Sequence, residues 1–136
     1  MARDYLLDTT ALSDLVLEQR VIQSRLTQLL PAGRIYICPI VRGEAIYGLE
    51  SMPKGRRRTA LAEKIFDVLA RLPSRSVPAR AGDHYGLIKR QAERRGLSLT
   101  DNDLWIAATA LAFDSALVTR DRDFRKIIHL SVENWS

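Results

Sequence analysis

The sequence holds a single cysteine, Cys38, among its 136 residues. One thiol can form neither an internal disulfide nor a cysteine-based zinc cluster, and its largely apolar neighbours over residues 36–40 predict a buried thiol in a reducing cytosol. No apolar run reaches the roughly 18 to 20 residues that cross a bilayer, and the start has an acid, Asp4, where a signal peptide carries a basic flank. We therefore expect a cytoplasmic protein with no membrane segment.

Histidine is equally scarce. The two histidines, His84 and His129, are far in sequence from the candidate acids and lack the spacing of metal ligands, which disfavours zinc. No glycine-rich phosphate loop follows a predicted strand, no Gly-x-Ser-x-Gly elbow occurs, and Cys38 has no evident histidine partner. Nucleotide binding by a phosphate loop and acyl transfer by a Ser or Cys nucleophile are thus disfavoured.

The length, with 46% hydrophobic and 27% charged residues, fits one globular domain spanning residues 1–136. The net charge of +5 is unevenly distributed: residues 54–100 carry twelve basic and four acidic side chains, whereas residues 101–136 carry four and six. A basic surface beside an acidic centre suits a protein that holds a polyanion next to a metal ion. A solvated, arginine-rich helical face explains the same charges.

Apolar runs alternate with segments of helical periodicity. We expect strands over residues 5–7, 35–38, 116–119 and 130–132, and a short edge strand over residues 76–78. Helices are expected within residues 10–16, 22–30, 41–51, 61–72, 81–95 and 104–113, with a helical turn over residues 121–126. Whether the first two helices are continuous is left open by the pattern. Such alternation predicts an α/β fold with a mostly parallel sheet covered on both faces.

Several acids fall where the strands of this sheet end. Asp8 ends the first strand, Glu44 lies one turn into the helix after the second, and Asp121 follows the strand that ends at Thr119. Ligands of open parallel sheets bind at the carboxyl ends of the strands, so these side chains are expected to converge, joined by Asp101 and Asp103 at the start of the central helix. Converging carboxylates repel one another unless a cation lies among them, and oxygen ligands select Mg²⁺ or Mn²⁺.

Each acid also has a purely structural explanation. Asp8 and Asp121 can cap the helical segments that follow them, and residues 100–103 match a capping box with Asp103 in the acidic position. Glu44 is the hardest to explain in this way, because its segment is otherwise apolar or small. The chemistry that the whole set indicates is hydrolysis of a phosphodiester by water that a metal activates.

At these residues the sequence resembles the PIN-domain nucleases, specifically the VapC toxins of toxin–antitoxin pairs. Residues 5–13 resemble the family's opening strand with its first acid, and residues 40–49 the segment with the second. Residues 102–110 and 117–124 resemble the third and fourth blocks, and residues 132–135 the usual close. The four blocks occur in the family's order, and the resemblance extends over nearly the whole chain.

The resemblance implies a three-layer α/β/α PIN-like fold, Mg²⁺- or Mn²⁺-dependent endoribonuclease activity, a homodimer and inhibition by a VapB-type antitoxin. It places Asp8, Glu44, Asp103 and Asp121 in the acid positions, with Asp8 and Asp103 as direct metal ligands. Spacing varies in the fourth block, so Asp123 is an alternative fourth acid. Thr119 is expected to hydrogen-bond one of the acids, and Asp101 is expected to cap the helix.

Six arginines are candidate contacts for RNA phosphates: Arg56, Arg57, Arg58, Arg90, Arg94 and Arg95. A catalytically silent PIN-like domain that binds RNA or a partner is the alternative function, and the complete acid set argues against it. A phosphoryl-transfer receiver or phosphatase built on Asp8 is a third possibility, disfavoured because the last third of the chain offers only Lys126 as the lysine that such sites need.

Overall fold

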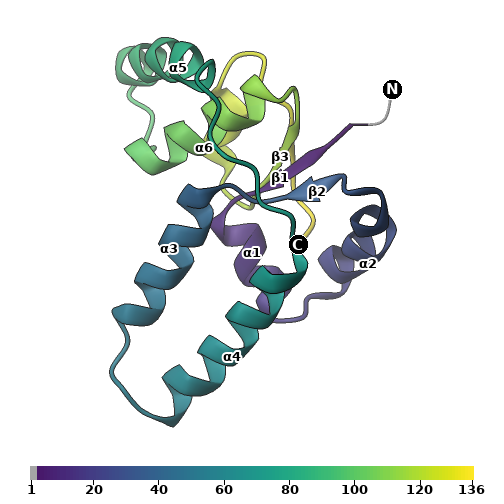
Figure 1. Cartoon of the computed structure of the whole chain (residues 1–136). Coiled ribbons are helices and arrows are strands. Elements are labelled where there is room, and N and C mark those ends of the chain that lie inside the picture. Colours follow the sequence, from purple (N-terminus) through teal and green to yellow (C-terminus); the bar gives the residue numbers. More distant parts are fainter. Residues whose placement is uncertain (1–2) are drawn as a thin grey trace.

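The computed structural model describes residues 3–136, whose strands form one parallel sheet (Figure 1). The strands are β1 (Tyr5–Leu7), β2 (Ile35–Tyr36), β3 (Ala116–Val118) and β4 (Val132–Glu133), in the order β2-β1-β3-β4. Every pairing is parallel. Leu6, Leu7 and Leu117 are completely buried, as expected for a parallel sheet covered on both faces.

Helices surround this sheet. They are α1 (Thr9–Val16), α2 (Arg20–Leu29), α3 (Pro39–Glu50), α4 (Arg56–Arg71), α5 (Ala81–Arg95) and α6 (Asp101–Ala112), with 3₁₀ turns η1 (Leu30–Ala32) and η2 (Arg122–Lys126). Figure 1 shows α5 and α6 on one side of the sheet, α2 on the other, and the hairpin of α3 and α4 extending away from it. The predicted three-layer α/β/α architecture is confirmed.

The helix boundaries follow from local chemistry. Glu18 adopts a left-handed φ of 59°, which interrupts the chain after α1 and makes α2 a separate helix. Pro39 occupies the first turn of α3, where its missing N–H costs nothing, so this helix begins two residues earlier than predicted. Gly96, at φ 62°, ends α5 in the left-handed conformation that glycine adopts without strain.

Two strand predictions need correction. Residues 76–78 form no strand; Ile37 instead makes a single parallel bridge with Ser74, where Arg75 N donates to the Ile37 carbonyl at 2.9 Å. Beyond this bridge the chain leaves the sheet, and the Arg75 side chain packs over the Tyr36 ring, 3.8 Å from its centroid. The strand predicted over residues 35–38 is correspondingly short, and the last strand lies at Val132–Glu133 instead of residues 130–132.

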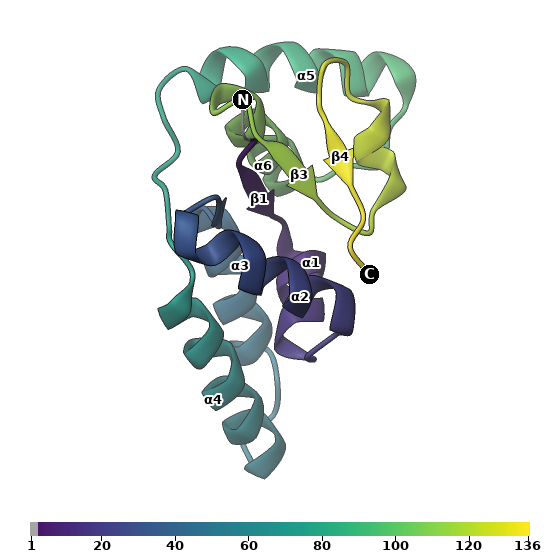
Figure 2. The same cartoon turned by 90° about the vertical axis from the view of Figure 1, so that its right-hand side faces the viewer.

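Helix α6 is the buried centre of one layer, as its apolar sequence predicted. Ala107, Ala108 and Ala110 are fully buried, and these small side chains let α6 approach both α5 and β3 (Figure 2). Tyr85 of α5 stacks on Trp105 of α6 with ring centroids 4.0 Å apart. The start of α6 is thereby fixed against the rest of the fold. No helix among residues 3–136 is both long and apolar enough to span a membrane.

Candidate metal centre at the strand ends

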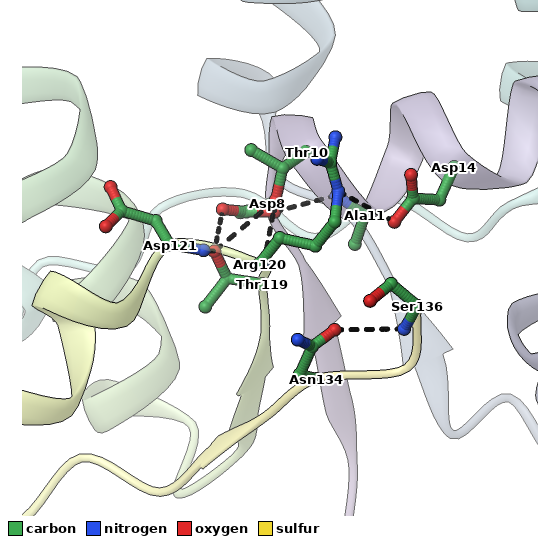
Figure 3. Close-up of polar contacts among 9 residues, drawn as sticks. All are labelled: Asp8, Thr10, Ala11, Asp14, Thr119, Arg120, Asp121, Asn134 and Ser136. Carbon is green, nitrogen blue, oxygen red and sulfur yellow. Dashed lines mark hydrogen bonds and ion pairs between the residues drawn. The ribbon is translucent and has the colours of Figure 1, made fainter.

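The carboxyl ends of β1 and β3 lie side by side, and their last residues meet there. Asp8 follows β1 and is 4% exposed; Thr119 follows β3 and is 2% exposed. The Thr119 hydroxyl donates a hydrogen bond to Asp8 Oδ2. Thr10 donates to Asp8 Oδ1 at 2.7 Å, and the backbone N–H of Ala11 donates to the same oxygen at 2.9 Å (Figure 3). Asp8 is therefore a buried carboxylate held by three donors.

Burial raises the pKa of Asp8 above its ordinary value. The hydrogen bonds from Thr119, Ala11 and Thr10 act in the opposite direction, and the negative charge of Asp103 adds to the upward shift. The charge of Asp103 is thus felt at Asp8, although burial is the larger cause of the shift. A cation between them would remove this repulsion.

Glu44 of α3 contacts the residue that follows Asp8. Its Oε1 accepts a hydrogen bond of 2.5 Å from the hydroxyl of Thr9, the residue that follows Asp8. The two threonines after β1 thus face different acids, with Thr9 bonded to Glu44 and Thr10 bonded to Asp8. Neither hydroxyl was among the site residues expected from the sequence.

Asp103 belongs to a capping box at the start of α6. Its Oδ2 accepts from Thr100 N at 3.0 Å, and its own N–H donates to Thr100 Oγ1 at 3.2 Å. The structure thus confirms capping by Asp103, as it does for Asp8 at α1 and for Asp121 at η2. Each cap uses only part of a carboxylate's hydrogen-bonding capacity, so capping leaves oxygen lone pairs available to a cation.

The two candidates for the fourth acid differ in their surroundings. Asp121 N donates to Thr119 Oγ1 at 3.0 Å, which ties this residue to the Asp8 cluster, although its carboxylate points away from Asp8 in Figure 3. Asp123 instead pairs with Lys126 at 3.2 Å. Asp123 thus has a cationic partner, whereas the Asp121 carboxylate forms no ion pair within residues 3–136, which favours Asp121 as the acid that acts with the cluster.

Asp101 does not cap α6 as expected, because Thr100 does so. The Asp101 carboxylate is exposed and accepts from Lys89 Nζ at 3.0 Å and from Tyr85 Oη at 2.9 Å. These hydrogen bonds lower its pKa. Asp101 is thus engaged with α5.

The donor set fits a hard divalent ion. Among residues 3–136, no group of three or more His, Cys, Asp or Glu side chains is arranged to hold a metal. Mg²⁺ does not require such a cage, since it is commonly bound by one or two carboxylates together with water and substrate phosphate. Asp8, with the Thr10 and Thr119 hydroxyls beside it, and Asp103 supply two carboxylates, which matches that pattern.

The predicted phosphate-binding arginines occupy two opposite ends of the molecule. Arg56, Arg57 and Arg58 begin α4 at the far tip of the α3–α4 hairpin, whereas α5 lies at the other end (Figure 1). Arg58 is paired with Glu50 at 2.9 Å. On α5, Arg90 pairs with Glu93 at 3.5 Å, Arg94 is exposed, and Arg95 donates to the Lys126 carbonyl. The two groups do not form one continuous basic groove.

A basic pocket nearer to Asp8 was missed. It is lined by Thr119, Arg120, Asp121, Arg122, Arg125 and Asn134. Arg122 and Arg125 are three residues apart in a 3₁₀ turn, which repeats every three residues and so places them on one face. This spacing was visible in the sequence, but the segment was judged by its acids and its net negative charge.

An apolar groove also adjoins the site. It runs between α1, α3 and α4, and its lining residues include Thr9, Leu12, Val16, Glu44, Leu49, Met52, Leu61 and Ile65. Thr9 and Glu44 belong to the acidic site as well, so the groove opens directly onto it.

Comparison with known proteins agrees with this geometry. The PIN domain model matches residues 5–130. Ribonuclease VapC2 of Haemophilus influenzae is 32% identical over 134 residues, covering 96% of this chain and 97% of the relative. Ribonuclease VapC2 of Rickettsia felis is 33% identical over 102 residues, 74% of each chain.

Solved structures show the same likeness. The structure of VapBC2 from Rickettsia felis bound to a promoter DNA fragment matches with a TM-score of 0.85 and 29% identity, covering 97% of this chain and 98% of that one. DNA-bound VapBC from Salmonella typhimurium matches with a TM-score of 0.83 and 26% identity, covering 99% and 100%. The chain belongs to the PIN domain family, and within it to the VapC type.

Proposed function

We propose that this protein is a metal-dependent endoribonuclease and the toxin of a type II toxin–antitoxin pair. The observation that carries the proposal is the buried Asp8 carboxylate at the end of the central strand, held by Thr119 and repelled by the nearby Asp103. A carboxylate in this position costs stability without a counter-ion, and a bound Mg²⁺ or Mn²⁺ would supply one. The VapC relatives named as ribonucleases support RNA as the substrate.

Asp8 and Asp103 would hold the ion. When bound, such an ion stabilises negative charge on the phosphate oxygens and favours ionisation of a water molecule. The hydrogen bonds from Thr119, Thr10 and Ala11 keep the Asp8 oxygens fixed, so little reorganisation is needed when substrate arrives.

Glu44 has the role of positioning the attacking water and accepting its proton. It is partly buried, and only its Oε1 is engaged, by Thr9, among the bonds of residues 3–136. The other oxygen can accept a hydrogen bond from water. Asp121 completes the acidic cluster, linked to Asp8 through the Thr119 hydroxyl.

The test is cleavage of single-stranded RNA by the purified protein with Mn²⁺ or Mg²⁺ and with a chelator. Wild type should cleave only with metal, and Asp8→Asn and Asp103→Asn should each reduce kcat by at least about 100-fold, an effect typical of losing one transition-state contact. Asp67→Asn, at an exposed α4 residue that pairs with Arg71, is the matched control and should retain full activity. A folded wild-type protein that binds RNA but never cleaves it would instead indicate the silent domain.

We also propose that a VapB-type antitoxin is the partner, and that an apolar segment of it occupies the groove between α1, α3 and α4. The solved VapBC complexes support such a partner. The groove opens at Glu44, so a segment lying in it could place a Lys or Arg against the acids.

Met52→Glu, which puts a charge into the groove, should weaken antitoxin binding and leave RNA cleavage intact. Glu63→Gln on the exposed side of α4 is the control. Equal antitoxin affinity in both variants would place the partner elsewhere. A homodimer remains a proposal based on the family resemblance, and sedimentation velocity tests it.

A further inference from the structure

The basic pocket beside Asp8 contains two arginines, Arg122 and Arg125, that have no acidic partner within residues 3–136. It is lined by Thr119, Arg120, Asp121, Arg122, Arg125 and Asn134, with a volume of about 330 Å³. Thr119 is the residue that binds Asp8, so this pocket begins where the acidic site ends. A ligand bound at Asp8 and extending past Thr119 would enter it.

The arginines of this pocket are not equivalent. Arg120 Nε pairs at 3.0 Å with Asp14, whose side chain is 7% exposed, and its backbone N–H donates to Thr10 at 3.0 Å (Figure 3). Arg120 is therefore part of the framework that supports Thr10. Its positive charge is balanced by a buried carboxylate.

Arg122 and Arg125 have no such partner. Both are exposed, and within residues 3–136 neither side chain forms an ion pair or a hydrogen bond with protein. The acid between them, Asp123, is already paired with Lys126. The Asn134 Oδ1 accepts from Ser136 N at 2.9 Å, which leaves its amide nitrogen free to donate outward.

This arrangement presents two guanidinium groups and an amide donor next to a site proposed to act on a phosphodiester. A guanidinium group matches the oxygens of a phosphate with two parallel hydrogen bonds. Resting on the proposed ribonuclease function, we infer that Arg122, Arg125 and Asn134 hold a backbone phosphate of single-stranded RNA adjacent to the bond that is cleaved. The pocket therefore sets the path of the RNA strand across β3.

The placement explains why the acidic site can bind a polyanion at all. Asp8, Glu44, Asp103 and Asp121 repel RNA, and the predicted arginines of α4 and α5 lie at opposite ends of the fold. Arg122 and Arg125 supply positive charge at the edge of the acidic site itself. Their contribution falls on substrate binding, since Asp8, Asp103 and Glu44, the groups proposed to hold the ion and the attacking water, do not line this pocket.

The experiment compares Arg122→Gln/Arg125→Gln with a control pair, Arg20→Gln/Lys64→Gln, which removes two exposed charges from α2 and α4. Cleavage of a single-stranded RNA pool of random sequence gives KM and kcat without knowledge of the preferred site. The pocket variant should raise KM at least about tenfold and change kcat less than twofold. In a plot of log kcat/KM against log salt concentration, the slope for the pocket variant should be shallower than that for wild type by about 0.7 to 1.4. This is the difference expected from losing one or two phosphate contacts on a single strand.

Arg122→Lys/Arg125→Lys keeps the charges and should recover most of the salt dependence but only part of the affinity. Unchanged KM in the Gln variant, or an equal loss in the control pair, would overturn the inference. So would weakened antitoxin binding with unchanged KM, because the pocket would then serve an acidic protein segment.

Binding of a 12-nucleotide single-stranded RNA to Asp8→Asn, with and without the two Gln substitutions, tests the phosphate pocket separately from the proposed ribonuclease activity. If wild type cleaves nothing but this binding still depends on Arg122 and Arg125, the phosphate pocket stands and the proposed activity fails. If wild type cleaves and the binding is indifferent to both arginines, the activity stands and the pocket assignment fails.

Discussion

The Thr119 hydroxyl donates a hydrogen bond to the Asp8 carboxylate across 111 residues of sequence. The two residues end adjacent parallel strands, β1 and β3, so the pairing of Leu7 with Val118 brings them together. The same hydroxyl accepts from Asp121 N at 3.0 Å. One side chain thus joins Asp8 to Asp121, the first and the last of the four candidate acids in sequence order, and the proposed metal site is built at this junction.

Removing that hydroxyl should raise the pKa of Asp8 further. The hydrogen bond stabilises the ionised carboxylate, so Thr119→Val removes a contribution that lowers the pKa, while burial remains. Carboxyl-carbon NMR of the metal-free protein should show Asp8 titrating at a higher pH in Thr119→Val than in wild type. Thr119→Ser keeps the hydroxyl and should titrate close to wild type; identical titration of the Val variant would contradict the assigned hydrogen bond.

Asp8→Asn should stabilise the metal-free fold at neutral pH. A carboxyl whose folded-state pKa lies above its unfolded value contributes stability below the unfolded pKa, and this contribution is lost as pH rises through the folded pKa. Wild type therefore loses stability over that range, whereas the uncharged Asn, which still accepts from Ala11 N, does not. Urea unfolding with a chelator should show the advantage of the variant at pH 7 and its shrinkage near pH 4. An advantage independent of pH would exclude Asp8 ionisation as its cause.

Thr100→Ala should reduce both stability and activity. It removes the hydroxyl that accepts from Asp103 N, and loss of a threonine cap costs about 1 kcal/mol of the free energy of unfolding. Because the same cap fixes Asp103 at the start of α6, kcat should fall as well. Thr100→Ser should restore both quantities. A variant with reduced stability but normal kcat and metal affinity would show that the cap does not position Asp103.

Mn²⁺ should raise the melting temperature of wild type. A ligand that binds only the folded state at about 100 times its Kd adds about 2.7 kcal/mol of stability. Asp103→Asn should lose most of this shift while folding normally, since Asn Oδ1 can still accept from Thr100 N. Asp67→Asn should respond like wild type, and an equal Mn²⁺ response in all three proteins would point to binding outside this site.

Strong local signals made much of this architecture predictable. Residues 5–7 and 116–118 are short, continuous apolar runs, which favour buried strands, and they form β1 and β3. The capping box of Thr100 and Asp103 lies within four residues and was visible as a pattern. The pairing of Ile37 was harder to predict, since its bridge to Ser74 and the neighbouring contact of Arg75 with Tyr36 both join segments that are distant in the sequence.

The candidate acids were chosen from their positions in the sequence, and one supporting group was predicted as well. Asp8 and Asp121 follow strands, Asp103 lies in the first turn of α6 and Glu44 lies within α3. Thr119 forms the expected hydrogen bond with an acid, whereas the contacts of Thr9 and Thr10 were not predicted. The pairing of Asp101 with Lys89 joins two helices and could not be read from the sequence, whereas Asp123 and Lys126 pair three residues apart within η2. The basic pocket was missed because its arginines alternate with acids in the sequence. The arginine and acid side chains are directed apart only by the 3₁₀ turn of η2.

The most direct test of the central claim is a crystal structure grown with Mn²⁺ and analysed by anomalous scattering. The account predicts an anomalous peak within about 2.5 Å of carboxylate oxygens of both Asp8 and Asp103, at ordinary metal–oxygen distances. A fully soaked crystal with no peak at Asp8, or with the Asp8 carboxylate paired to an arginine of its own chain, would contradict it.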